Sequence, residues 1–129
     1  MFQSIFNYII LYFIPLLPRF IVKVFASRYV AGESKDDSLK IVQELNKKGY
    51  SVTIDILGEH SKSEDIAKSV KNEYLDLYRS IKSLKLDCNI SIKPTHLGLD
   101  LGIDCAKNNI FALLETAMQF NNFLRIDME

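Results

Sequence analysis

The sequence lacks an excess of charge of either sign. Its 129 residues contain 16 basic and 16 acidic side chains, so the formal net charge at pH 7 is zero. Proteins that bind a phosphate backbone or an anionic surface mainly through electrostatics carry a surplus of lysine and arginine. The composition therefore predicts that nucleic acid is not a partner.

Cysteine and glycine are also scarce. The two cysteines, Cys88 and Cys105, lack the close spacing of a metal knuckle or redox pair. No metal site is expected, and a reducing, intracellular setting is the simplest interpretation. Three of the five glycines, Gly58, Gly98 and Gly102, have the spacing of neither a Rossmann turn nor a P-loop. A nucleotide held by either turn is therefore not expected.

The apolar N-terminus lacks the unbroken run that a membrane span needs. Residues 1–25 are the most apolar part of the chain, but Pro15 and Pro18 interrupt them and Arg19 ends the uncharged part. Basic residues follow the run, whereas those of a signal peptide precede it. We expect an N-terminal helical segment over residues 1–27, with a helix entered at Pro18 that packs on the main domain or makes a shallow membrane contact.

From residue 28 onward, segments typical of strands alternate with segments typical of helices. Runs rich in β-branched residues predict the strands, and apolar residues at three- and four-residue intervals predict the helices. Ser34 is expected to cap the first helix, and Ser61 with Glu64 has the spacing of a capping box for the second. The expected strands span residues 28–31, 51–55, 89–93 and 123–127, with three helices between them. This order predicts an α/β fold with a parallel sheet.

Polar residues recur where these strands end. Asp55, Lys93 and Asp127 lie 38 and 34 positions apart, about the length of one strand-helix repeat. A doubly wound sheet and half of an eight-fold barrel both fit that period, but in either fold the carboxyl ends of the strands line the ligand site. We therefore expect these residues to meet at one site.

The strand ends resemble the successive signatures of proline dehydrogenases. The segments that carry the resemblance are residues 29–33 (YVAGE), 52–59 (VTIDILGE), 90–99 (ISIKPTHLGL) and 124–129 (LRIDME), and the likeness extends from Leu17 onward. It implies half of a (βα)₈ TIM-type barrel with about four parallel strands and an N-terminal apolar helix. It also implies an FAD-dependent oxidation of L-proline to 1-pyrroline-5-carboxylate in proline catabolism. Electrons would pass to a membrane quinone, so the implied location is the cytoplasm, at the inner face of a membrane.

The resemblance also implies roles for single residues. Lys93 matches the lysine that pairs with the carboxylate of proline, and Glu59 matches an acid that pairs with an arginine from late in the barrel. Asp127 and Asp55 match active-site carboxylates, and Met128 matches a position whose backbone touches FAD. His96 departs from the pattern, because relatives often carry glutamine there, but both side chains donate and accept hydrogen bonds. His60 matches no functional residue and is expected in a loop.

The resemblance covers only the first half of such a barrel, residues 28–129, ending after the fourth strand. The paired arginines that clamp the substrate carboxylate belong to the second half, so a separate second half is an expected partner. A non-catalytic remnant or interaction partner that kept the half-barrel is the alternative, and another barrel enzyme acting on a small acid is a third reading. Expressed alone, these residues are expected neither to retain FAD nor to oxidise proline. They are also expected to aggregate through unpaired strand edges and an open, apolar inner face.

Overall fold

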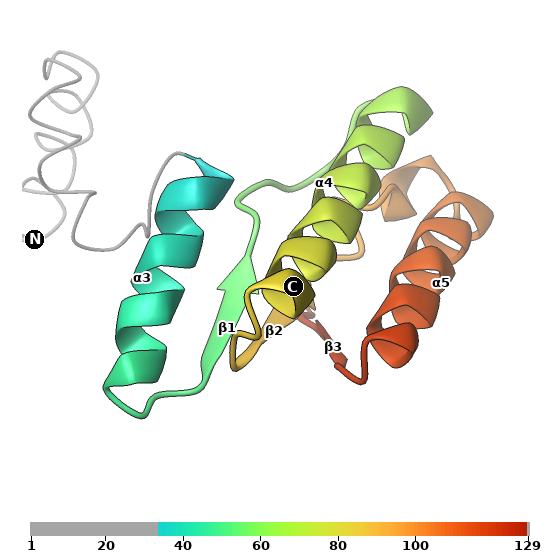
Figure 1. Ribbon diagram of the computed structural model, residues 1–129. Helices are drawn as coiled ribbons and strands as arrows, with labels where there is room; N and C mark the ends of the chain where they lie inside the picture. Colours follow the sequence, from blue (N-terminus) through green and yellow to red (C-terminus); the bar gives the residue numbers. More distant parts are fainter. Residues whose placement is uncertain (1–33, 129) are drawn as a thin grey trace, which may run out of the picture. The chain divides into compact units, whose positions relative to one another are not determined.

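The computed structural model describes residues 34–128, in which helices and parallel strands alternate (Figure 1). The order is α3 (Lys35–Lys47), β1 (Val52–Asp55), α4 (Glu64–Ser83), β2 (Cys88–Ile92), the 3₁₀ helix η2 (Leu99–Leu101), α5 (Ile103–Gln119) and β3 (Leu124–Ile126). The strands form one parallel sheet in the order β1-β2-β3, which confirms the predicted α/β class and is consistent with part of a barrel.

The chain consists of two compact units, Met1–Ser38 and Leu39–Glu129, and all three strands lie in the second. The expected strand over residues 28–31, the expected helix from Pro18 and the segment 1–27 lie outside the described residues. No helix within residues 34–128 combines the length and the apolar character that a membrane crossing requires.

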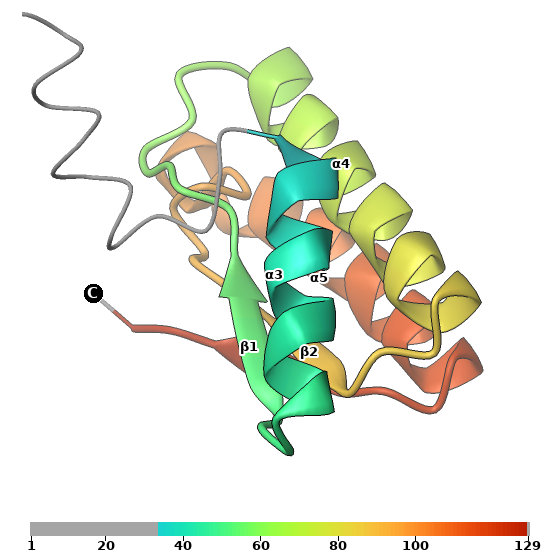
Figure 2. The same cartoon turned by 60° about the vertical axis from the view of Figure 1, so that its left-hand side comes forward.

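The helices pack on one face of the sheet (Figure 2). Alternate strand residues, which contribute to the core, are apolar. Ile90 and Ile92 of the central strand are fully buried, because Val52 and Ile54 lie on one side of them and Leu124 on the other. The helices contribute the rest of the core from residues at helical spacing. These are Leu39 and Val42 of α3, Val70, Tyr74, Leu77, Tyr78 and Ile81 of α4, and Leu113 and Ala117 of α5.

The opposite face of the sheet is polar, so the expectation of an open, apolar inner face was wrong. Thr53 Oγ1 donates to Asn89 Oδ1 at 3.0 Å across β1 and β2, and two residues earlier in both segments Ser51 Oγ donates to Asp87 Oδ2 at 2.5 Å. Arg125 of β3, which is level with Ser91 of β2, is exposed. Side chains alternate between faces along a strand, so the polar residues on either side of Val52 are the sequence signal for this face. One of the two reasons for expecting aggregation is thereby removed, while aggregation through the strand edges stays a prediction.

The start of α4 also differs from the expectation. The N-cap residue is Ser63, whose hydroxyl accepts a hydrogen bond from the backbone N–H of Ile66 at 3.3 Å. Ser61 is buried instead, and its hydroxyl donates to the carbonyl of His96 at 2.6 Å. The hydroxyl of Ser61, which the local capping-box pattern predicted to cap α4, thus forms a hydrogen bond to a distant loop instead. The predicted cap of α3 is confirmed, since Ser34 Oγ accepts from the N–H of Asp37 at 3.2 Å.

Candidate active site

Asp55, Lys93 and Asp127 all lie at the carboxyl ends of neighbouring strands, as predicted. Asp55 is the last residue of β1 and is level with Ser91 in the register, and Lys93 directly follows β2. Asp127 directly follows β3, and its N–H donates to the carbonyl of Ile92 at 2.9 Å. Adjacent strands in a sheet are roughly 4.8 Å apart. The three predicted residues therefore share one edge of the sheet.

Lys93 and Glu59 form an ion pair at this edge, through Nζ and Oε1. Lys93 is the less accessible partner, with 20% of its side chain exposed against 50% for Glu59. Glu59 comes from the loop after β1, so the pair joins the ends of two strands. The structure thus brings together two residues that the sequence marked separately, and it shows that the Lys93 ammonium has a carboxylate-binding geometry.

Asp55 is hydrogen-bonded to a fully buried tyrosine that the sequence marked only as part of the helix core. The hydroxyl of Tyr74, in the middle of α4, donates to Asp55 Oδ1 at 3.1 Å and accepts from the N–H of Ile56 at 3.4 Å. Burial raises the pKa of Tyr74 well above its ordinary value, and the negative charge of Asp55 raises it further. The phenol therefore remains protonated and acts as the donor.

His96 is buried between the loops that follow β1 and β2. Only 8% of its surface is exposed, and its Nδ1 has no hydrogen-bond partner among residues 34–128. The ring lies directly against the backbone of Gly58, where an added Cβ would come within 2.3 Å of Nε2. Burial lowers the pKa of His96, against the opposing effects of the Asp55 and Glu73 charges. The folded protein therefore favours the neutral ring.

This lowered pKa predicts that acid destabilises the protein through His96. As the pH falls below the ordinary value of 6.5, the imidazole takes up a proton in the unfolded chain before it does so in the folded one. The contribution of the neutral ring to the free energy of unfolding is therefore fully present above that pH and decreases below it. Urea unfolding at about pH 7.5 and about pH 5.5 should show a smaller acid-induced loss in His96→Gln than in the unmodified protein. An equal loss in both would contradict the prediction, and the exposed His60 provides the control, since His60→Gln should not reduce it.

Further hydrogen bonds join the same two loops. The N–H of Ser61 donates to the carbonyl of Thr95 at 3.2 Å, beside the Ser61–His96 bond described above. His60 Nδ1 lies 2.6 Å from Oδ2 of Asp100, in η2. His60 was expected to be a loop residue without a role, and it is in a loop, but it links the two loops through Asp100. These contacts fix the loop that carries Glu59 relative to the loop that begins with Lys93.

Met128, the residue predicted to contact flavin, lies just beyond the carboxyl end of β3. Met128 directly follows Asp127 and is 81% exposed. Whether Met128 touches a cofactor stays a prediction.

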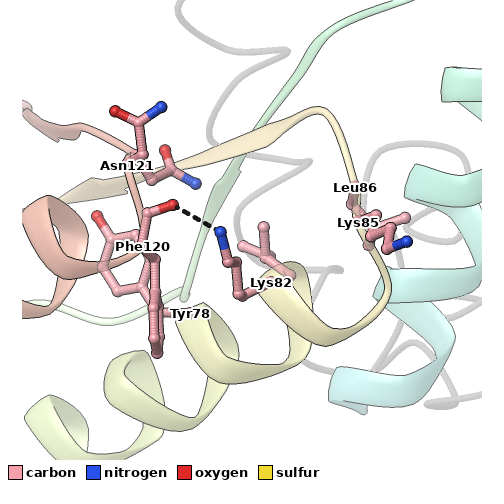
Figure 3. A pocket seen from close by; sticks show the side chains of 8 residues that line it. Tyr78, Lys82, Lys85, Leu86, Phe120 and Asn121 are labelled. Atoms are coloured by element: carbon pink, nitrogen blue, oxygen red, sulfur yellow. Dashed lines mark hydrogen bonds between the residues drawn. The ribbon is translucent and has the colours of Figure 1, made fainter.

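A pocket of about 460 Å³ lies at the opposite end of the sheet (Figure 3). It is lined by Tyr78, Ile81, Lys82, Lys85, Leu86, Phe120, Asn121 and Asn122, from the end of α4 and the segments that lead into β2 and β3. The ammonium group of Lys82 donates to the carbonyl of Phe120 across it at 3.4 Å (Figure 3). In strand-helix folds the ligand site lies at the carboxyl ends of the strands. The pocket is therefore separate from the candidate active site.

Comparisons of the sequence with a family model and with curated proteins point to the same family. The family model described as "Proline dehydrogenase" matches residues 38–129. "Proline dehydrogenase 1" of Bacillus subtilis (strain 168) is 38% identical over 104 residues, which cover 81% of this chain and 34% of that protein. "Proline dehydrogenase 2" of the same strain is 33% identical over 107 residues, which cover 83% of this chain and 35% of that protein. "Proline dehydrogenase" of Deinococcus radiodurans is 27% identical over 107 residues, covering 81% and 34%. The chain thus spans about one third of the length of the curated relatives it matches.

Proposed function

The chain belongs to the proline dehydrogenase family, and from this membership we propose that it supplies part of an active site that oxidises L-proline to 1-pyrroline-5-carboxylate. FAD is the proposed hydride acceptor. The observation that carries the proposal is the ion pair of Lys93 at the carboxyl end of β2. Lys93 already holds a carboxylate, that of Glu59, at the end of the sheet where a ligand would bind.

In this proposal the carboxylate of proline takes the position of the Glu59 carboxylate beside Lys93. A charge-assisted hydrogen bond from a partly buried ammonium group fixes the substrate in place, and a fixed substrate presents one ring carbon to the acceptor. Glu59 is half exposed on its loop, so it can leave the pair when substrate enters. Lys93 thus binds and orients the substrate and exchanges no proton with it.

Asp55 and Asp127 are the proposed active-site carboxylates. Loss of a hydride from the carbon beside the ring nitrogen leaves positive charge on that nitrogen. Carboxylates held at the same end of the sheet stabilise this charge as it develops. Their placement on the strands to either side of Lys93 supports this role, because the substrate carboxylate and ring nitrogen are then bound by neighbouring strands.

The backbone at Met128, just after β3, is proposed to contact FAD. When bound, the flavin accepts the hydride removed from proline. The exposure of Met128 next to Asp127 supports this placement. Transfer of the electrons to a quinone, by an enzyme in the cytoplasm at the inner face of a membrane, completes the proposal and rests on the resemblance alone.

The test of the proposed function has two arms, because the chain spans a third of its relatives. The first arm is the purified chain by itself. The second is the chain joined to the remaining two thirds of Proline dehydrogenase 1 of Bacillus subtilis. We expect the joined protein to show flavin absorbance and dye-coupled oxidation of L-proline, and the chain alone to show neither, since its three described strands offer only one edge of the site.

The stereoisomer D-proline serves as a control substrate, and whichever arm oxidises L-proline is called the active form below. A joined protein that folds and binds flavin but leaves L-proline unoxidised would refute the proposed function. Activity of the chain alone would show that no contribution from elsewhere is needed, and would contradict the expectation for the first arm.

A further inference from the structure

Two tyrosines on α4, Tyr74 and Tyr78, are one helical turn apart and both fully buried. Their hydroxyl groups reach opposite ends of the sheet. Tyr78 donates to the carbonyl of Phe123, just before β3 begins, at 3.1 Å. Tyr74 donates to the carboxylate of Asp55, where β1 ends. The same side chain on the same helix therefore meets a backbone group at one end of the sheet and a predicted active-site group at the other.

A buried tyrosine hydroxyl needs a hydrogen-bond partner, and for Tyr78 the backbone carbonyl meets that need. The contact of Tyr74 does more, because Asp55 is an exposed residue whose side chain would otherwise rotate freely. The Tyr74 ring is held by the core, and its oxygen also accepts the N–H of Ile56. A donor fixed on two sides thus holds one oxygen of a carboxylate at the rim of the site.

The direction of this hydrogen bond is fixed by protonation. Burial, and then the charge of Asp55, raise the pKa of Tyr74. The phenol therefore keeps its proton and donates the hydrogen bond, and the Asp55 carboxylate accepts it. Tyr74 therefore engages one of the two carboxylate oxygens of Asp55, Oδ1, as the acceptor.

We propose that Tyr74 is a positioning residue, which orients the carboxylate of Asp55 for the reaction without touching the substrate. The inference rests on the proposed function, because it takes Asp55 as an active-site carboxylate. It adds a residue from the helix layer that no strand-end motif contains.

The test compares Tyr74→Phe with Tyr78→Phe, since each variant removes one buried hydroxyl from the same helix. In the active form, Tyr74→Phe should lower kcat for L-proline roughly ten-fold or more and change KM less than about three-fold. Tyr78→Phe should leave kcat within about two-fold, even where it lowers the unfolding temperature as much. Equal effects of both variants on kcat would overturn the inference.

A second measurement on the chain by itself separates this inference from the proposed function. Tyr74→Phe should speed hydrogen exchange at the Ile56 amide and shift the carboxyl-carbon NMR signal of Asp55, whereas Tyr78→Phe should change neither. If both signals are unchanged in Tyr74→Phe, the positioning role is overturned whatever the proline assay gives. If they change while neither the unmodified chain nor the unmodified joined protein oxidises L-proline, the proposed function fails and the contact stands.

Discussion

Replacing Lys93 by alanine lowers kcat/KM for L-proline by roughly ten- to a hundred-and-fifty-fold in the active form, while flavin stays bound. The estimate follows from the loss of one charge-assisted hydrogen bond, worth about 1.5–3 kcal/mol, between the ammonium group and the substrate carboxylate. Flavin is retained because its proposed contacts lie at the end of β3, beyond Lys93. Steady-state kinetics with L-proline and flavin absorbance of the purified variant measure the two parts of this prediction.

A matched control is available at the opposite end of the sheet. Lys82 also makes a hydrogen bond, to the carbonyl of Phe120, but it lies in the pocket at the amino ends of the strands. Lys82→Ala should therefore leave kcat/KM within about two-fold, since exposed substitutions away from the site have small effects. Unchanged proline kinetics in Lys93→Ala, or an equal loss in Lys82→Ala, would refute the role given to Lys93.

Replacing Gly58 by alanine destabilises the protein by about 2 to 6 kcal/mol. The new methyl group would lie 2.3 Å from Nε2 and 2.4 Å from Cε1 of His96, and that ring is buried, so the ring or the loop of Gly58 would have to shift. Overpacking of this kind costs about 1–3 kcal/mol, and the backbone of Gly58, at φ +157°, adds strain of about 1–3 kcal/mol for a residue with a side chain. Urea unfolding followed by circular dichroism measures the loss.

A double-mutant cycle tests the cause of that loss. If the clash with His96 is responsible, Gly58→Ala should cost less in a His96→Ala background than in the unmodified protein, because the ring is gone. Gly49→Ala is the control for backbone strain alone, since Gly49 has φ +87° and no atom within 4 Å of the position of an added Cβ. Equal costs of Gly58→Ala in both backgrounds would show that His96 does not limit the space at Gly58.

Much of the described fold could be predicted from local patterns. The runs of β-branched residues placed β1, β2 and β3 to within one or two residues. The three- and four-residue spacing in α4 identified the middle of its buried face, although Ile66 and Leu84 at the two ends of that pattern are exposed. Both patterns depend on geometry that repeats along a single element, which a sequence records directly. The capping of α4 could not be read this way, because Ser61 and Ser63 are both suitable caps. The role of Ser61 is decided by its hydrogen bond to the carbonyl of His96, 35 positions further on, which links two loops.

The sequence by itself determined which residues stand at the ends of the strands, and therefore that Asp55, Lys93 and Asp127 share one edge of a parallel sheet. Strand alternation and repeat length suffice for that, because parallel neighbours bring equivalent positions together. Only the tertiary structure decided which groups meet there: Lys93 with Glu59, Tyr74 with Asp55, and the His96 ring with the backbone of Gly58. These contacts depend on how far each loop extends and which way each helix is turned, and both are set by packing between elements that are distant in the chain.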